Sequence, residues 1–335
     1  MKRFLAFILA ALMLTGCSAT PEEEAPQTTA AAQEATIPEE TIYMDTVVLD
    51  IQEPEQEAEI ILQPPEPVRP DILKPEASGE LVAKNDKAII DYSHMEDGYV
   101  MVCYTAERDC RLKARVQNKN TYTYNLTRGE WCVFPLTDEN GAYQIRIYEN
   151  TYGSSYALAM ATEINVTLED EFAPFLRPNQ YVNYSDATQA VEEAWKLTKD
   201  IDTPLGKVEA VYNYVVRGLS YDNEKARTVQ SGYIPDLDAV LKEKKGICFD
   251  YASLMTAMLR SQGIPCKMVF GYTGGAYHAW ISVWTEDTGW MDGVIFFDGV
   301  AWQRLDPTFA SCDNKSDNIM QYIGDGSNYQ EKYFY

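Results

Sequence analysis

The sequence predicts an α+β protein in which a small antiparallel β-sandwich precedes a domain of helices followed by strands. Residues 80–168 contain short alternating runs rich in Val, Ile, Thr and Tyr, which is the pattern of half-buried strands. After residue 171 apolar residues recur at helical spacing, and strand-like runs return from residue 267 onward. Nine of the sixteen prolines lie between residues 18 and 78, which predicts a disordered N-terminal stalk. We therefore expect four parts: a signal peptide (1–17), an acidic proline-rich linker (18–78), a β-sandwich-like domain (79–170) and a second domain (171–335).

Length and charge narrow the possible functions. A chain of 335 residues is long enough for two domains beside its non-globular segments. With 28 basic and 51 acidic residues the formal net charge is −23, which argues against nucleic-acid binding and suits a surface-displayed protein. Two distant histidines and no paired-cysteine spacing predict no metal site, and we expect no cofactor. The seven cysteines are not a disulfide scaffold, and their pairing stays open.

The N-terminus has the pattern of a secretory signal. Three residues with two basic side chains precede the apolar run 4–14, which is too short to span a bilayer as an ordinary helix. The run ends in Leu14-Thr15-Gly16-Cys17, which resembles the lipobox of bacterial lipoproteins. The resemblance implies that Cys17 is lipid-modified and anchors the mature chain to the cell membrane, facing the extracytoplasmic side. The alternative is a signal peptide that contains a cysteine by coincidence.

The segment 18–78 is expected to be an extended tether. Its acids far outnumber its two bases, and it cannot bury enough apolar surface to offset its chain entropy. Glutamate and proline favour an extended linker over a collapsed one. The apolar runs 42–51 and 60–62 could dock as strands, or they could form only transient structure.

The β-sandwich is predicted from strand-like runs at 98–104, 112–116 and 143–148, with Asn140-Gly141 as a hairpin turn. The tyrosines within 121–124 and 148–156 have two interpretations. They could form a face that binds a glycan or a peptide, or they could be ordinary strand formers half-buried on a sheet.

Helices are predicted at 187–199, with Ser185 and Asp186 as its cap, and at 208–216, 236–244 and 249–261. Gly263 is the expected C-cap of the last helix. Strands should follow at 267–272, 279–284, 293–297 and 300–305.

The chemistry is expected at Cys248, which follows the turn residue Gly246 and opens an apolar helical pattern. A thiol at a helix start meets the positive end of the helix dipole and unpaired N–H groups, and both favour the thiolate. His278 can serve as the general base, and Asp306 can orient its imidazole. A free cysteine is more often a small buried hydrophobe, so the order Cys-His-Asp is what favours catalysis. Asp250 shares the helix with Cys248, and we expect it to make a structural hydrogen bond.

These residues lie in motifs that resemble the transglutaminase-like superfamily of papain-like thiol enzymes, over roughly residues 175–335. The matching pieces are Gly246-x-Cys248-x-Asp250-Tyr251-Ala252, Leu259-Arg260-x-x-Gly263-Ile264-Pro265-Cys266, Gly271-Tyr272, His278-Ala279-Trp280 and Trp302-x-x-Leu305-Asp306-Pro307-Thr308. The stretch between His278 and Asp306 is longer than the family usually shows, and an inserted hairpin is the simplest explanation.

The resemblance implies a papain-like fold with Cys248, His278 and Asp306 as the catalytic triad. It also suggests Tyr221 as an oxyanion donor beside the Cys248 backbone N–H, and Trp280 and Trp302 as walls of the cleft. The expected function is an extracytoplasmic cysteine peptidase, amidase or protein-crosslinking acyltransferase. Its substrate would be a protein or peptide, with cell-wall peptide among the candidates. The competing hypothesis is a catalytically silent binding or scaffolding lipoprotein that uses the same cleft.

Overall fold

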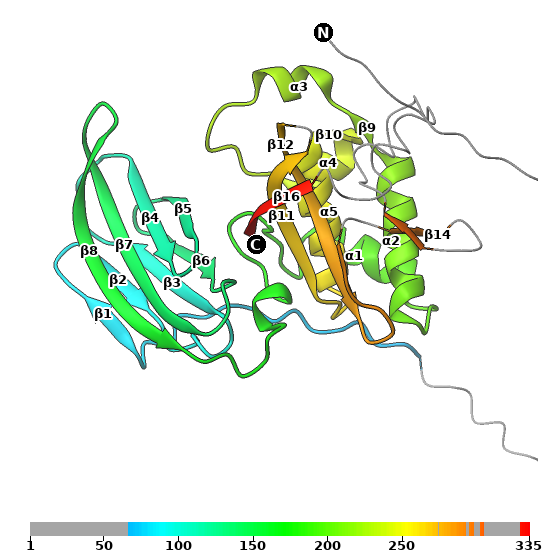
Figure 1. The fold of residues 1–335 in the computed structure, drawn as a ribbon, viewed down its shortest axis with the longest axis horizontal. Helices are drawn as coiled ribbons and strands as arrows, with labels where there is room; N and C mark the ends of the chain where they lie inside the picture. Colours follow the sequence, from blue (N-terminus) through cyan, green and yellow to red (C-terminus); the bar gives the residue numbers. More distant parts are fainter. Residues whose placement is uncertain (1–65, 274, 293–294, 298–301, 305–328) are drawn as a thin grey trace, which may run out of the picture. The chain divides into compact units, whose positions relative to one another are not determined.

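The computed structural model describes residues 66–273, 275–292, 295–297, 302–304 and 329–335 (Figure 1). The chain from Gln63 to Tyr335 groups into one compact unit. The predicted signal peptide, Cys17, the apolar runs 42–51 and 60–62, the turn Asp298-Gly299 and Asp306 lie outside the described residues. None of the helices in the described ranges is both long and apolar enough to cross a membrane.

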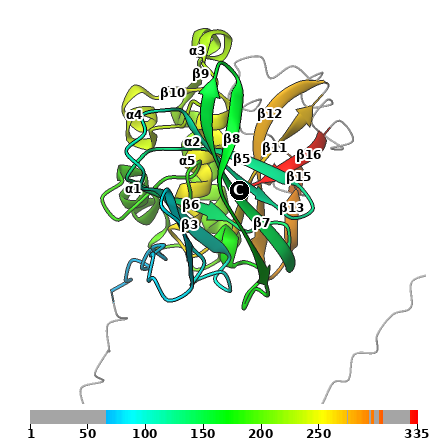
Figure 2. The same cartoon turned by 90° about the vertical axis from the view of Figure 1, so that its left-hand side faces the viewer.

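Two four-stranded antiparallel sheets form the first part of the unit, as the sequence predicted. The first sheet has the order β1-β2-β3-β6; its strands are Val82–Lys84, Ala88–Asp91, Tyr99–Tyr104 and Trp131–Pro135. The second has the order β5-β4-β7-β8; its strands are Thr121–Leu126, Leu112–Gln117, Gly141–Tyr152 and Ser155–Val166. Figure 2 shows β7 and β8 as long neighbouring strands.

The buried side of the second sheet follows the period of two that the sequence shows. Along β4 the buried residues are Leu112, Ala114 and Val116, and along β5 they are Tyr122, Tyr124 and Leu126. Tyr122 and Tyr124 are 2% and 1% exposed, so the structural interpretation of these two tyrosines is confirmed.

A buried carboxylate joins the two sheets. Glu149 of β7 accepts hydrogen bonds from the Tyr104 hydroxyl of β3 at 2.5 Å and from Lys87 Nζ at 2.9 Å. Burial alone would raise the pKa of the Glu149 carboxyl, but the hydrogen bonds from Tyr104 and Lys87 outweigh it and leave the pKa below its usual value.

The prediction of a hairpin turn at Asn140-Gly141 is wrong. The chain passes there from β6 in the first sheet to β7 in the second, and these two strands do not pair. The Asn140 side chain instead accepts the backbone N–H of Leu168 at 2.8 Å, and Glu139 takes a positive φ of 68°. An Asn-Gly pair supplies a turn, but the sheet that each flanking strand joins is decided by packing.

Part of the predicted linker is held against the folded unit. Residues 66–78 contain no helix or strand, yet Ile72 is only 8% exposed. Lys74 Nζ lies 2.5 Å from Asp186, and Arg69 lies 3.6 Å from the same carboxylate. The chain is therefore attached near the start of the first helix before β1 begins.

Five α-helices follow the sandwich: α1 (Gln189–Thr198), α2 (Pro204–Gly218), α3 (Asn223–Thr228), α4 (Leu237–Glu243) and α5 (Cys248–Arg260). Four of them match the predicted helices, and α3 was not predicted. The predicted cap of α1 is wrong: the N-cap is Thr188, and the first helical N–H donates to Asp238 Oδ1 at 2.8 Å. Asp186 is drawn away by its ion pairs with Lys74 and Arg69.

Helix α5 is the centre of the second part. Eleven of its thirteen residues are buried, because α1, α2 and α4 contact it along with two strands of a sheet (Figure 1). That sheet has the order β13-β12-β11-β16; its strands are Gly289–Asp292, Ala276–Thr285, Cys266–Thr273 and Tyr329–Phe334. Strands β12 and β13 close on each other at Thr285 and Gly289, so the stretch after His278 does contain a hairpin. A separate pair is formed by β14 (Ile295–Phe297) and β15 (Trp302–Arg304).

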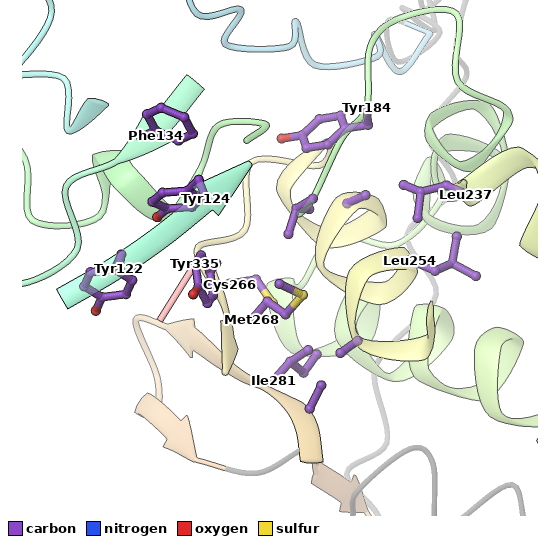
Figure 3. Packing of buried hydrophobic residues seen from close by; sticks show 14 of the residues in the cluster. Tyr122, Tyr124, Phe134, Tyr184, Leu237, Leu254, Cys266, Met268, Ile281 and Tyr335 are labelled. Carbon is purple, nitrogen blue, oxygen red and sulfur yellow. The ribbon is translucent and has the colours of Figure 1, made fainter. Parts of the chain in front are cut away.

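The last strand and residue close the core. Tyr335 exchanges backbone hydrogen bonds with Met268 and is 5% exposed. Its ring meets the rings of Tyr122 and Tyr124 edge-on, with centroids 5.5 and 5.9 Å away (Figure 3). The sandwich and the helical part therefore share one apolar core.

Candidate active site

Cys248 is placed by the turn that precedes α5. Ile247 is the N-cap and Cys248 the first helical residue, half-buried at the helix start. Lys244 ends α4 in the left-handed conformation with a φ of 51°. A Cβ on Gly246 would come within 2.6 Å of the Asp250 Cβ, so only glycine allows this close approach. The local sequence thus fixes where the thiol stands.

Asp250 holds the start of α5 in place, as the sequence analysis expected. Its buried carboxylate accepts the backbone N–H of Ile247 at 2.7 Å, Lys225 Nζ at 2.8 Å and the Tyr233 hydroxyl at 2.5 Å. Lys225 Nζ also lies 4.3 Å from the centroid of the Tyr233 ring. Burial and the neighbouring Asp250 raise the pKa of Tyr233 well above its ordinary value, so its hydroxyl stays a donor. One carboxylate therefore ties α5 to α3 and to the loop after it.

Tyr221 lies beside the Cys248 turn. It ends the two-residue strand β9 (Ser220–Tyr221), which pairs in parallel with β10 (Lys245–Gly246) and places Tyr221 opposite Gly246. The next residue, Asp222, donates its N–H to the Gly246 carbonyl at 2.8 Å and caps α3 with its side chain. Tyr221 and Cys248 line the same cavity.

The cavity at Cys248 is about 470 Å³, and half of its described lining residues are aromatic. Seven aromatic residues line it: Tyr181, Tyr221, Tyr233, Phe249, Phe270, Tyr277 and Tyr335. No side chain of Asp, Glu, Lys or Arg is among its described lining residues. Burial raises the pKa of Tyr181 to about 12, so its hydroxyl is neutral at physiological pH. The cavity therefore offers flat rings and neutral polar groups to a ligand.

His278 lies on β12, which packs against α5. It is 8% exposed, stands opposite Gly271 of β11, and its ring stacks on that of Trp280 with centroids 6.2 Å apart. Its neighbour Tyr277 lines the cavity. Burial first, and then nearby groups that include Cys248, raise the pKa of Tyr277 to about 12. Strand β12 therefore reaches the Cys248 cavity through Tyr277, whereas His278 is not among the described residues that line it.

Of the predicted site residues Trp280, Trp302 and Asp306, only Trp280 has a described side chain. Asp306 and the Trp302 side chain lie outside the described residues, so their roles stay predictions. Trp280 is 1% exposed and contacts the Tyr329 ring at 5.1 Å between centroids. It is not among the described residues that line the cavity, and its role as a cleft wall also stays a prediction.

Six of the seven aromatic residues that line the cavity were not found from the sequence, and three of them show why. Tyr277 directly precedes His278, and that adjacency was an available signal. Tyr233 follows α3, whose capping residue Asp222 could have predicted the helix. Tyr335 is the last residue of the sequence and has no local pattern that would connect it with Cys248.

The remaining described cysteines provide a contrast with Cys248. Cys103, Cys110, Cys132 and Cys266 are free thiols. Burial raises the pKa of Cys266 to about 11 and also raises the pKa of Cys103 and Cys132. Among the residues that the structure describes, no group of three or more His, Cys, Asp or Glu side chains could hold a metal ion.

Two protein families match parts of this chain. Residues 193–293 match the transglutaminase-like superfamily, and residues 1–18 match the prokaryotic membrane lipoprotein lipid attachment site. The second match means that the protein is lipid-anchored on the outer face of a membrane.

Two relatives match parts of the chain. The uncharacterized protein YebA of Bacillus subtilis is 27% identical over 200 residues, which cover 52% of this chain and 27% of that protein. A protein-glutamine gamma-glutamyltransferase of Pseudomonas aeruginosa is 32% identical over 68 residues, 16% of this chain and 10% of that enzyme. The matches thus span about a quarter or less of these relatives.

Among solved structures, red sea bream transglutaminase aligns with a TM-score of 0.29 and 12% identity, covering 64% of this chain and 48% of that one. The family assignment rests on the sequence match over residues 193–293, which spans α2 to α5 and reaches β13. The chain carries a domain of the transglutaminase-like superfamily together with a prokaryotic lipoprotein lipid attachment site.

Proposed function

We propose that this domain is a thiol enzyme that acts on amide bonds of proteins or peptides outside the cytoplasmic membrane. The observation that carries the proposal is the position of Cys248, which is the first residue of α5 and opens on the aromatic cavity. A structural cysteine has a different environment. Cys266 shows it: that thiol is fully buried and its pKa is raised to about 11.

In the proposed reaction the Cys248 thiolate attacks the carbonyl carbon of a carboxamide or peptide bond. A carbon–sulfur bond forms, the carbon–nitrogen bond breaks, and His278 gives its proton to the leaving amine. Asp306 orients the imidazole and stabilises its charged form. The product is a thioester between the substrate acyl group and Cys248.

The tetrahedral intermediate carries a negative oxygen, and we propose two donors for it. One is the backbone N–H of Cys248, which as a first-turn N–H of α5 has no partner within the helix. The other is the hydroxyl of Tyr221, a residue that lines the same cavity and stands opposite Gly246. Donors of this kind typically lower an acyl-transfer barrier by several kcal/mol.

The thioester is then resolved by water or by a primary amine. Water yields a carboxylate and makes the protein a peptidase or amidase. An amine yields a new amide and makes it a crosslinking acyltransferase. The gamma-glutamyltransferase relative supports the second outcome, although its match covers a small part of either protein. Proteins and cell-wall peptides near the membrane are the proposed substrates.

The alternative is a catalytically silent binding lipoprotein that holds a peptide in the same cavity. The aromatic lining favours it as the second candidate, because rings and neutral hydroxyls hold a ligand without chemistry. It differs from the enzyme in one testable respect: it does not need a reactive Cys248.

The test is the rate at which iodoacetamide alkylates each cysteine at neutral pH, followed by mass spectrometry. We expect Cys248 to react at least about tenfold faster than Cys110, which is also part-exposed, and we expect Cys266 to stay unmodified. His278→Ala should slow the alkylation of Cys248 alone. His94→Ala is the matched control, since His94 lies in the sandwich and pairs with Asp97 at 3.0 Å.

A Cys248 that reacts no faster than Cys110, or is indifferent to His278→Ala, favours the binding protein over the enzyme. If the thiol is activated, two assays on casein separate transfer from hydrolysis. Incorporation of a fluorescent amine into casein indicates transfer, and release of casein peptides indicates hydrolysis. Cys248→Ser should abolish either activity.

A further inference from the structure

The outer face of the sheet β5-β4-β7-β8 carries three cations side by side. On β4 the exposed residue Arg115 alternates with the buried Ala114 and Val116, so the odd-numbered side chains point outward. The register sets Arg115 directly opposite Arg146 of β7, and sets Lys113 opposite Tyr148. We call Lys113, Arg115, Arg146, Tyr148 and Tyr156 the cationic face.

The three cations of this face make their contacts with neutral groups of the described residues. Arg146 donates to the amide oxygens of Gln117, at 2.9 Å, and of Gln144. Arg115 lies over the Tyr148 ring at 5.3 Å from its centroid, and Lys113 donates to the Asn125 side chain. In the described part of the chain, none of the three cations forms an ion pair.

A shortage of carboxylates does not explain this arrangement. The sequence has 51 acidic and 28 basic residues. The register places one carboxylate on this face, Glu163 of β8, which accepts from Gln144 Nε2 at 3.0 Å and reaches Arg146 only through that amide. Like charges directly opposite each other destabilise a sheet. Two facing arginines on a protein with a net charge of −23 therefore point to a partner that supplies the negative charge.

The same face is hollowed and partly aromatic. A cavity of about 430 Å³ is lined by Lys113, Arg115, Thr123, Tyr148, Ser154 and Tyr156. Ser154 belongs to the turn between β7 and β8, which closes one end. Guanidinium groups bind carboxylates and phosphates through a planar fork of N–H donors, and tyrosine gives a flat apolar ring with a polar hydroxyl.

We propose that the cationic face binds an anionic polysaccharide, with its carboxylate or phosphate groups on Arg115 and Arg146 and its sugar rings on Tyr148 and Tyr156. A polysaccharide chain can follow the strands and fill the concavity, whereas a planar bilayer surface cannot enter it. The lipid anchor on the outer face of a membrane exposes the protein to such polymers. The site is separate from the Cys248 cavity, with which it shares no lining residue.

Affinity electrophoresis of the full chain in native gels tests the proposal. The gels contain polygalacturonate, a phosphorylated mannan or neutral dextran, so that carboxylate and phosphate ligands are separated from an uncharged one. We expect an anionic polymer to retard the wild-type protein, dextran to leave its mobility unchanged, and added salt to weaken the retardation. Equal retardation by dextran, or none by either anionic polymer, overturns the proposal.

Variants locate the binding. Arg115→Gln/Arg146→Gln should raise the dissociation constant about tenfold or more, since two charge-assisted contacts are lost. Lys84→Gln/Arg227→Gln removes the same charge from exposed residues elsewhere. This double variant should change the dissociation constant by less than about twofold. If both double variants weaken binding equally, the effect is one of net charge and the site is refuted.

Two further measurements exclude other roles for the arginines. Because facing arginines repel, Arg115→Gln/Arg146→Gln should unfold at an unchanged or higher urea concentration. A lower unfolding midpoint means that the arginines serve the sheet, which contradicts the proposal. The second measurement uses a variant that lacks the lipid anchor and tests whether it sediments with phosphatidylglycerol vesicles. If vesicle binding exceeds polymer binding and depends on Arg115 and Arg146, the partner of the cationic face is a membrane surface and the polysaccharide proposal is wrong.

Discussion

At the scale of single residues, Asp250 has the largest consequence for the site. It lies two positions after Cys248 and is fully buried, yet it is bound by Ile247, Lys225 and Tyr233. Helix α5 is held by this carboxylate at its start and by its buried apolar residues along its length. The wall of the cavity around Tyr233 could not be fixed without it, because α3 has no buried residue of its own.

Asp250→Asn should therefore destabilise the protein and loosen this wall. The amide keeps the shape of the carboxylate, but one of its two oxygens becomes a donor and the charge that pairs with Lys225 is lost. We expect a loss of about 2 kcal/mol in the free energy of unfolding, measured by urea denaturation. Asp200→Asn makes the same charge change at an exposed position and should stay within about 0.5 kcal/mol of wild type. An Asp250→Asn protein as stable as this control would show that Lys225 and Tyr233 do not depend on the carboxylate.

At the scale of elements, the close contact between β11 and β16 depends on Gly271. This residue stands opposite both His278 of β12 and Glu331 of β16, next to an irregularity in the β11–β16 register. A Cβ at this position would overlap the carbonyl oxygen of Gln330 and come within 2.6 Å of the Trp280 ring. Strand β12, which carries His278, and strand β16 therefore flank β11 at Gly271, where there is no room for a side chain.

We expect Gly271→Ala to force β16 away from β11 and to lower the free energy of unfolding by about 2 kcal/mol. The alanine cannot be accommodated by a rotamer change, because the backbone of Gln330 is in the way. Gly218→Ala is the matched control, since an added methyl there at the end of α2 meets nothing within 4 Å. It should be neutral or slightly stabilising. Equal effects of the two substitutions in thermal unfolding would contradict the assigned contact.

At the scale of the whole molecule, a buried arginine joins segments that are far apart in the sequence. Arg260 at the end of α5 donates to the carbonyl oxygens of Cys266, Arg177 and Tyr335, with the closest donors at 2.7, 2.6 and 2.6 Å. Burial lowers the pKa of the guanidinium, and no Asp or Glu side chain of the described residues pairs with it. Its contribution is geometric, because a planar fork can serve three carbonyl groups at once.

Arg260→Met should lower the free energy of unfolding by about 3 kcal/mol, because three buried acceptors lose a charged donor and the methionine restores only the packing. Urea denaturation gives the value. Arg227→Met, at an exposed position of α3, removes the same charge and should have an effect below about 0.5 kcal/mol. A loss that is equally small in Arg260→Met would show that these carbonyl groups are satisfied without the guanidinium.

Much of the fold and part of the site follow from local patterns. Alternation predicted the strands of the sandwich, the helical period predicted four of the five helices, and motif order located Cys248 and His278. The sequence missed α3, which is short and has no buried residue to give it a period. It also misjudged Asn140-Gly141, because the same two residues suit a hairpin and a crossing between sheets.

The sequence by itself determined the anchor, the order of elements and the start of the helix that carries the thiol, because each depends on neighbours in the chain. Only the tertiary structure decided that Tyr335 lines the Cys248 cavity and that Arg115 faces Arg146. These meetings join residues that are far apart in the sequence. They are set by strand register and by the packing of buried faces, and no local pattern encodes either one.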